Sequence, residues 1–241
     1  MFFHRKELMV PVEVRKPDPV FAQFLLQQFG GATGELTAGL QYWIQSFHCP
    51  KPGIRDLLQD IAVEEFGHLE VVGKLIEEHT RGIEKTVPEL EHSPIFAIRG
   101  RGPHLIDDAG VSWTAAYINE GGDVVRDLRA DIAAEAGARE TYEVLLERAI
   151  DPGTKKVLHY LLTREVAHTK MFMKALESLG KLTEPLFGNI KPDETVKVYY
   201  HLSTNGAAQR GPWNQEPEFT YVADPAKMIE HGELAGVGGK H

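Results

Sequence analysis

The residues with the most evident chemistry are glutamates and histidines that recur at a fixed spacing. In each half of the chain a glutamate is followed thirty residues later by Glu-x-x-His, and the second set is offset from the first by 100 positions. Residues three apart on a helix lie on one face, so each Glu-x-x-His pair can reach a single point. If four helices carry them, four carboxylates and two imidazoles converge as ligands for two metal ions in the core of a bundle. The six residues are Glu35, Glu65, His68, Glu135, Glu165 and His168.

The residues around the first glutamate favour such a site. Small residues cluster near Glu35 in the run FGGATGELTAGL: Gly30, Gly31, Ala32, Gly34 and Gly39. Glycine inside a helix costs about 1 kcal/mol relative to alanine, so clustered glycines indicate close backbone approach or room for a ligand. Buried carboxylates without positive charge are strongly destabilising, and bound metal ions would remove that cost. Tyr42, seven residues after Glu35, shares its helical face, and Tyr142 follows Glu135 at the same spacing.

Each residue taken alone has an ordinary structural interpretation. A single Glu-x-x-His is common on helices, and only its repetition with an equally spaced glutamate makes chance improbable. Glu64 should point about 100° away from Glu65 and be solvated. Asp56 and Asp60, four residues apart, are typical of a solvated helix face, and His159 of a surface or packing position.

Four long stretches are expected to be helices. They span about residues 18–47, 53–79, 123–150 and 151–179. Asp18 is a plausible N-cap with Pro19 in the first turn, and Gly180 is an expected stop signal.

The loop lengths indicate how these helices pair. Only a few residues join the first helix to the second and the third to the fourth, so each pair should be an antiparallel hairpin. About forty residues separate the hairpins, as in bundles with one long crossover. We therefore expect an all-α, ferritin-like four-helix bundle over residues 1–180. Residues 181–241 form a tail that we expect to pack on the bundle or on a neighbouring subunit.

Composition excludes several classes of function. The formal net charge of −9 and the absence of a Lys/Arg-rich run argue against nucleic-acid binding. No segment approaches the roughly 20 apolar residues of a membrane helix, and no signal peptide is evident. Cys49 is the only cysteine, which fits a reducing cytoplasm.

The ligand pattern and its flanking sequences resemble the manganese catalases, the non-haem catalases of bacteria. The similar stretches include IAVEEFGHLEVV, the WTAAYINEGGD approach to the third helix, DLRADIAAEAGARETYE, LLTREVAHTKMF and GPWN in the tail. The resemblance covers most of the chain. It implies two manganese ions per chain that disproportionate hydrogen peroxide to O₂ and water, cycling between Mn(II)/Mn(II) and Mn(III)/Mn(III).

The same resemblance implies a role for each site residue. Glu35 and His68 would ligate one manganese, Glu135 and His168 the other, and Glu65 would bridge them. Glu165 would carry protons as general acid and base rather than ligate. Tyr42 would hydrogen-bond to the ligands and hold the geometry of the cluster.

Two features bear on the details of this resemblance. Some members have an arginine directly before the glutamate equivalent to Glu135, where this chain has Ala134, so access to the site or its local charge should differ. Asp56 and Asp60 match positions that bind calcium at a subunit contact in some members. The tail lacks a clear pattern for the remaining ligands, which makes calcium doubtful here.

Two alternatives remain open at this point. Carboxylate and imidazole ligands accept iron as well as manganese, so a di-iron oxidase of ferritin-like fold has the same spacing. A structural protein related to spore-coat proteins that resemble manganese catalases could retain the site for stability. The family resemblance also implies a homohexamer.

Overall fold

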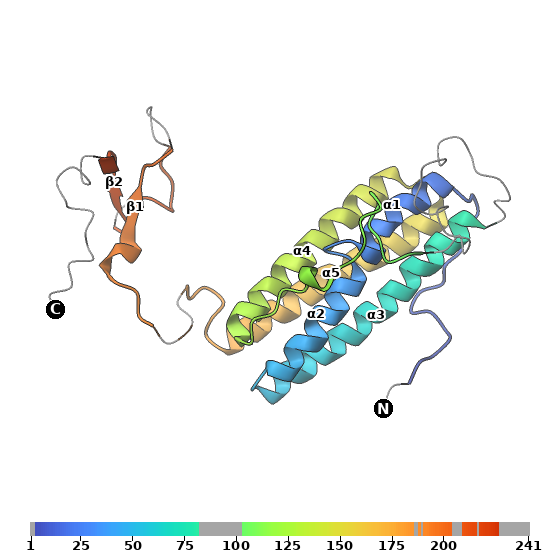
Figure 1. Ribbon diagram of the computed structural model, residues 1–241, viewed down its shortest axis with the longest axis horizontal. Helices are drawn as coiled ribbons and strands as arrows, with labels where there is room; N and C mark the ends of the chain where they lie inside the picture. The colour runs from blue at the N-terminus through green and yellow to red at the C-terminus, as the bar shows by residue number, and fades with distance from the viewer. Residues whose placement is uncertain are drawn as a thin grey trace. The chain divides into compact units, whose positions relative to one another are not determined.

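The computed structural model describes residues 3–81, 103–185, 188, 190–203, 209–215 and 217–226. It divides into two compact units, Met1–Phe187 and Gly188–His241. The first unit is helical, and its α-helices are drawn in Figure 1. Their bounds are α1 Pro19–Gly30, α2 Glu35–His48, α3 Pro52–Thr80, α4 Val124–Arg148 and α5 Pro152–Ser178.

Two helical hairpins build the bundle, as predicted. Helix α2 packs along α3, and α4 packs along α5 (Figure 1). The hairpins meet where α2 lies against α4 and α3 against α5, while α1 extends the bundle against α3 and α4. The long connection between the hairpins includes a short 3₁₀ helix, η3 Ala115–Tyr117, and its residues 82–102 lie outside the described part of the chain. The fold is therefore a ferritin-like bundle with one long crossover.

The prediction of a single helix over residues 18–47 is wrong, because the helix is interrupted between Gly30 and Glu35. Gly31 and Gly34 are extended here, and both are crowded. A Cβ at Gly31 would lie 2.3 Å from the Gln27 carbonyl oxygen, and one at Gly34 would lie 2.7 Å from that of Gln28. The glycines thus allow a sharp turn of the backbone, and Glu35 becomes the first residue of a new helix.

The other helix bounds are confirmed to within two residues. Side chains of Asp18, Asp123 and Asp151 accept hydrogen bonds from backbone N–H groups at the starts of α1, α4 and α5. Helix α5 is followed by Gly180 with a φ of 67°, the left-handed conformation that glycine adopts without strain.

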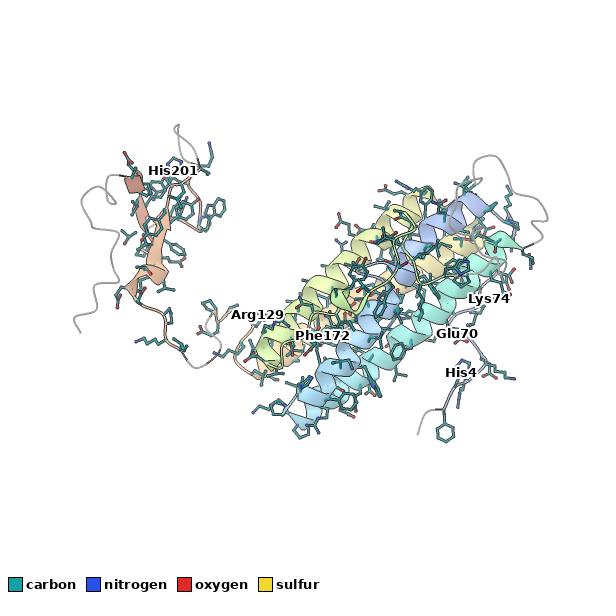
Figure 2. The ribbon with its side chains drawn as sticks, viewed as in Figure 1. His4, Glu70, Lys74, Arg129, Phe172 and His201 are labelled. Carbon is teal, nitrogen blue, oxygen red and sulfur yellow. The ribbon has the colours of Figure 1, made fainter. Side chains whose placement is uncertain are left out.

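The hydrophobic core consists of two separate clusters. One contains Leu25, Val72 and Leu158, and the other contains Leu58, Leu128 and Phe172. Phe172, labelled in Figure 2, is fully buried and packs edge-on against Tyr42 with ring centroids 5.1 Å apart. Along α3, α4 and α5 the two clusters lie on opposite sides of the predicted ligands. A polar layer therefore crosses the middle of the bundle between two apolar layers.

The second unit contains a small parallel sheet. Strand β1 Val198–Tyr200 follows a 3₁₀ helix, η4 Glu194–Lys197, and pairs with β2 Thr220–Val222. Tyr199 stacks on Tyr221, and the Arg210 guanidinium lies 3.9 Å from the centre of the Tyr221 ring. The expected packing of the tail on the bundle or on another subunit stays a prediction. Across the described residues, no helix is both long and apolar enough to cross a membrane.

Candidate metal centre

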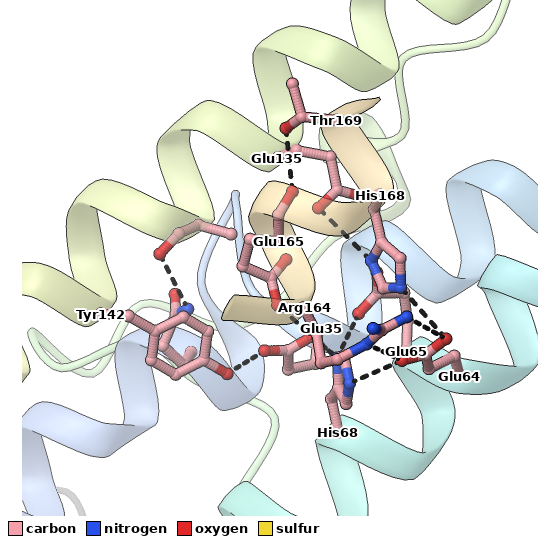
Figure 3. A network of polar contacts seen from close by, with 12 residues as sticks. Glu35, Glu64, Glu65, His68, Glu135, Tyr142, Arg164, Glu165, His168 and Thr169 are labelled. Atoms are coloured by element: carbon pink, nitrogen blue, oxygen red, sulfur yellow. Dashed lines mark hydrogen bonds and ion pairs between the residues drawn. The ribbon is translucent and has the colours of Figure 1, made fainter. Parts of the chain in front are cut away.

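The bundle brings all six predicted residues to one point in its interior. Figure 3 shows the cluster where the four helices meet, and every one of the six is at most 1% exposed. Within the described residues their ligand atoms form two groups, each with all atoms within 4.8 Å of one another. The first group is Glu35, Glu65, His68 and Glu165, and the second is Glu65, Glu135, Glu165 and His168. Two adjacent positions that share Glu65 and Glu165 are the arrangement expected for a dinuclear site.

Glu65 lies centrally between the two histidines. Its Oε2 is 2.8 Å from Nδ1 of His68, and its Oε1 is 2.7 Å from Nδ1 of His168. The imidazole rings stack with centroids 5.6 Å apart and an interplanar angle of 24°. Each carboxylate oxygen thus faces a different imidazole, so that Glu65 can serve two cations at once.

Local structure also favours negative charge at Glu35. As the first residue of α2, Glu35 lies where the helix exposes unpaired N–H groups and the positive end of its dipole. The break at Gly31–Gly34 creates this helix start inside the bundle. The orientation of Glu35 therefore depends on the same glycines that the sequence concentrates around it.

Burial and mutual repulsion perturb the carboxylates. Burial raises the pKa of Glu35 to about 8. Burial, followed by repulsion from Glu65, raises the pKa of Glu165 well above its usual range. Burial also acts to raise the pKa of Glu65, but its attraction to His68 and His168 outweighs burial and lowers it. The cluster thus holds more carboxyl groups than its two imidazoles can balance as carboxylates.

The chemistry of the donor set fits bound metal ions. Glu135 Oε2 and Glu165 Oε1 are buried and accept no hydrogen bond from any described residue. Buried polar atoms nearly always have partners, so their concentration at one point calls for cations. Carboxylate and imidazole ligands suit manganese and iron.

The tyrosine that follows each ligand glutamate forms a hydrogen bond with the ligand glutamate of the other hairpin. Tyr42 of α2 donates a hydrogen bond of 2.6 Å to Oε1 of Glu135 on α4. Tyr142 of α4 donates one to Oε1 of Glu35 on α2 (Figure 3). Both tyrosines are fully buried. Sequence reasoning gave no role to Tyr142, although its position seven residues after Glu135 was a signal.

These hydrogen bonds predict that each tyrosine affects metal binding at a different one of the two positions. Tyr142→Phe should weaken metal binding at the position formed by Glu35 and His68, and Tyr42→Phe at the position formed by Glu135 and His168. Loss of a hydrogen bond next to a ligand commonly lowers metal affinity by about 10–100-fold. Stepwise Mn²⁺ titration of metal-free protein followed by EPR checks this prediction, with Tyr200 of strand β1 in the second unit as the comparison for a Tyr→Phe change. Identical spectra and affinities for the two buried variants would contradict it.

Glu64 is not solvated, contrary to the sequence-based prediction. Its side chain is only 21% exposed and lies between Arg164 and the two histidines. Arg164 Nε donates to Glu64 Oε1 at 2.6 Å. A helical wheel places Glu64 away from Glu65, but the second hairpin supplies partners on that side.

A second buried network was also missed. Asp131, one turn before Glu135, is fully buried and accepts hydrogen bonds from Gln41 at 2.9 Å and Gln45 at 2.8 Å. The backbone N–H of Asn119 donates to Oε1 of Gln41. These bonds fix the crossover against the seam between α2 and α4.

Ala134 lies on the wall of a cavity of about 230 Å³ along that seam. Small side chains make up much of the lining, together with Gln41, Tyr117 and Asn119. The cavity lies beside the helical turns that carry Glu35 and Glu135. Ala134 leaves this space free of a long side chain, and a difference in access or local charge at the site stays a prediction.

The predicted calcium residues show no comparable cluster. Asp56 and Asp60 are exposed on α3, and neither belongs to a group of three or more potential ligands among the described residues. Calcium binding through a subunit contact stays a doubtful prediction.

Fold and site together define a dinuclear carboxylate protein of the ferritin-like bundle class. The family model described as "Manganese containing catalase" matches residues 1–237. The chain belongs to this family of manganese-containing catalases.

Individual relatives agree with the family assignment. A probable manganese catalase of Clostridium acetobutylicum is 35% identical over 226 residues, covering 91% of this chain and 98% of that protein. Protein CotJC of Bacillus subtilis is 37% identical over 188 residues, and the match covers 74% of this chain and 95% of CotJC. The crystal structure of KatB, a manganese catalase from Anabaena, is 63% identical, with a TM-score of 0.87 and coverage of 92% of this chain and 99% of that one.

Proposed function

We propose that the chain is a manganese catalase that disproportionates hydrogen peroxide to O₂ and water. The observation that carries this proposal is the pair of buried ligand groups that share Glu65 and Glu165. Two manganese ions at these positions would supply a two-electron centre, each ion changing by one electron between Mn(II) and Mn(III). The membership in the manganese-containing catalases supports manganese over iron.

The proposed ligands follow the two halves of the site. Glu35 and His68 would hold one ion, Glu135 and His168 would hold the other, and Glu65 would contribute a carboxylate oxygen to each. Contacts of Glu65 with both Nδ1 atoms, at 2.8 and 2.7 Å, support the bridging assignment. The buried hydroxyls of Tyr42 and Tyr142 orient the terminal carboxylates and limit their rotation.

Glu165 is the proposed proton carrier. Its Oε1 faces Nδ1 of His68 at 3.6 Å and accepts no hydrogen bond among the described residues. Burial and three neighbouring carboxylates raise the pKa of Glu165 well above its usual range, so this carboxyl group holds a proton more readily than an ordinary glutamate does. Oxidation of one peroxide to O₂ releases two protons, and reduction of the second peroxide to two water molecules takes up two. Glu165 Oε1 can hold one of these protons between the two half-reactions, and the second is carried by the other acid–base groups of the cluster.

Oxygen evolution from hydrogen peroxide, measured together with metal content on the same sample, tests the proposed function. We expect rapid O₂ release, about two Mn per chain, and resistance to low azide concentrations that inhibit haem enzymes. Two Fe per chain with little O₂ would replace the proposal by a di-iron oxidase. Two Mn with no O₂ would favour a structural role.

We further propose a cytoplasmic homohexamer. The lone Cys49 is buried and unpaired, which supports a reducing compartment. Val63 and Met171 leave apolar surface exposed on α3 and α5, which supports contacts between subunits. Light scattering after size exclusion should give six times the 26.9 kDa of one chain.

A further inference from the structure

One carboxylate outside the ligand groups faces both imidazoles from the side opposite Glu65. Glu64 Oε2 is 3.2 Å from Nε2 of His168, and Glu64 Oε1 is 3.6 Å from Nε2 of His68. Figure 3 shows Glu64 beside both rings at the edge of the cluster. The shorter contact is within the distance of a hydrogen bond and the longer one is a few tenths of an ångström beyond it, although neither has hydrogen-bond geometry in the structure.

Neither Nε2 atom has another partner. Both are buried, and neither makes a hydrogen bond to any described residue. A ring nitrogen that bears hydrogen and is buried without an acceptor destabilises the protein, so each Nε2–H needs the oxygen that lies nearest to it. For both rings that oxygen belongs to Glu64.

We propose that Glu64 is a positioning residue for both metal positions at once. By accepting an N–H from each Nε2, one carboxylate fixes both histidines in the tautomer that leaves Nδ1 free to bind metal. This inference rests on the proposed metal site but not on its catalytic activity. Such hydrogen bonds orient histidine ligands and increase their basicity in metalloproteins generally.

Arg164 holds Glu64 in place for this role. Its Nε and Nη2 donate to the two Glu64 oxygens at 2.6 and 3.3 Å, so both carboxylate oxygens are oriented from outside the site. The ion pair with the Arg164 guanidinium favours a carboxylate at this position, and a carboxylate has acceptor capacity for both rings.

Two substitutions separate this role from that of a surface ion pair. Glu64→Leu removes the acceptor for both rings, and both steps of metal binding should weaken. Glu64→Gln presents one carbonyl acceptor and one amide donor, so only one ring keeps an acceptor and one step should weaken more than the other. We expect losses of about 10–100-fold for each affected step.

The test is titration of metal-free full-length protein with Mn²⁺ by calorimetry, and with Co²⁺ by its visible absorption. Arg164→Gln removes the ion pair but leaves the contacts between Glu64 and the rings, and it should change affinity by less than about fivefold. Lys174→Gln is the matched control, because it removes an exposed ion pair with Glu177 on α5, the helix that carries Arg164. It should leave the metal affinities unchanged.

Wild-type affinities and Co²⁺ spectra in both Glu64 variants would overturn the proposal, as would an equal loss in Arg164→Gln and Glu64→Leu. These readouts are independent of turnover. A wild-type protein that binds two metal ions but releases no O₂ would overturn the proposed function while leaving the role of Glu64 intact.

Discussion

Glu165→Gln is expected to retain both manganese ions and to lose about 10²–10⁴-fold in turnover, the usual contribution of a general acid or base. The amide keeps the size and much of the hydrogen bonding of the carboxyl group, but it cannot exchange a proton near neutral pH. Steady-state O₂ evolution and metal analysis on the same preparation check the prediction.

The metal content in this experiment decides between two roles for Glu165. Its oxygen belongs to both potential ligand groups, so the geometry also allows direct coordination. Loss of manganese in the variant would make Glu165 a ligand, and turnover equal to wild type would remove its proton role. Glu177→Gln, an exposed carboxyl on the same helix, is the matched control and should leave both quantities unchanged.

His168→Ala should lower metal content and thermal stability together. The change removes one imidazole ligand and the partner of Glu65 Oε1, and it leaves a void in a fully buried position. Metal content should fall from about two ions per chain to one or fewer. Because bound ligand stabilises the folded state, the increase in melting temperature on adding Mn²⁺ should shrink as well.

Calorimetric melting curves with and without Mn²⁺, together with metal analysis, measure both effects. His159→Ala is the matched control, because His159 lies on the same helix but is exposed. Unchanged stoichiometry in His168→Ala would take His168 off the list of ligands. A loss of stability without any loss of metal would make its role one of packing alone.

The ligand cluster could be predicted because its information is local and repeated. Glu-x-x-His places two groups on one helix face whatever surrounds it, and the loop lengths decide which helices form hairpins. The helix starts at Asp18 and Asp151 were equally readable, since short polar side chains before a proline are characteristic of helix starts.

Apart from the break after Gly30, the features that were missed depend on contacts between hairpins. That break requires close approach of the local backbone at Gly31 and Gly34, which helical periodicity does not reveal. The hydrogen bonds of Tyr42 and Tyr142 follow from the rotation of α2 against α4, so the sequence could place each tyrosine on a face but could not pair it. Glu64 was misjudged because its partners, Arg164 and His168, come from the other hairpin.

Because each tyrosine hydrogen-bonds to the glutamate of the other hairpin, neither half of the chain contains a complete metal position. A lone hairpin would lack the tyrosine hydroxyl that orients its glutamate. Two identical hairpins related by a twofold axis would restore both tyrosine–glutamate hydrogen bonds by symmetry. The pair formed by Glu64 and Arg164 could not arise in that way, because a symmetric dimer would bring two like charges to the same seam. With both halves in one polypeptide, positions 64 and 164 can carry different residues. This difference allows a single carboxylate to face both imidazoles.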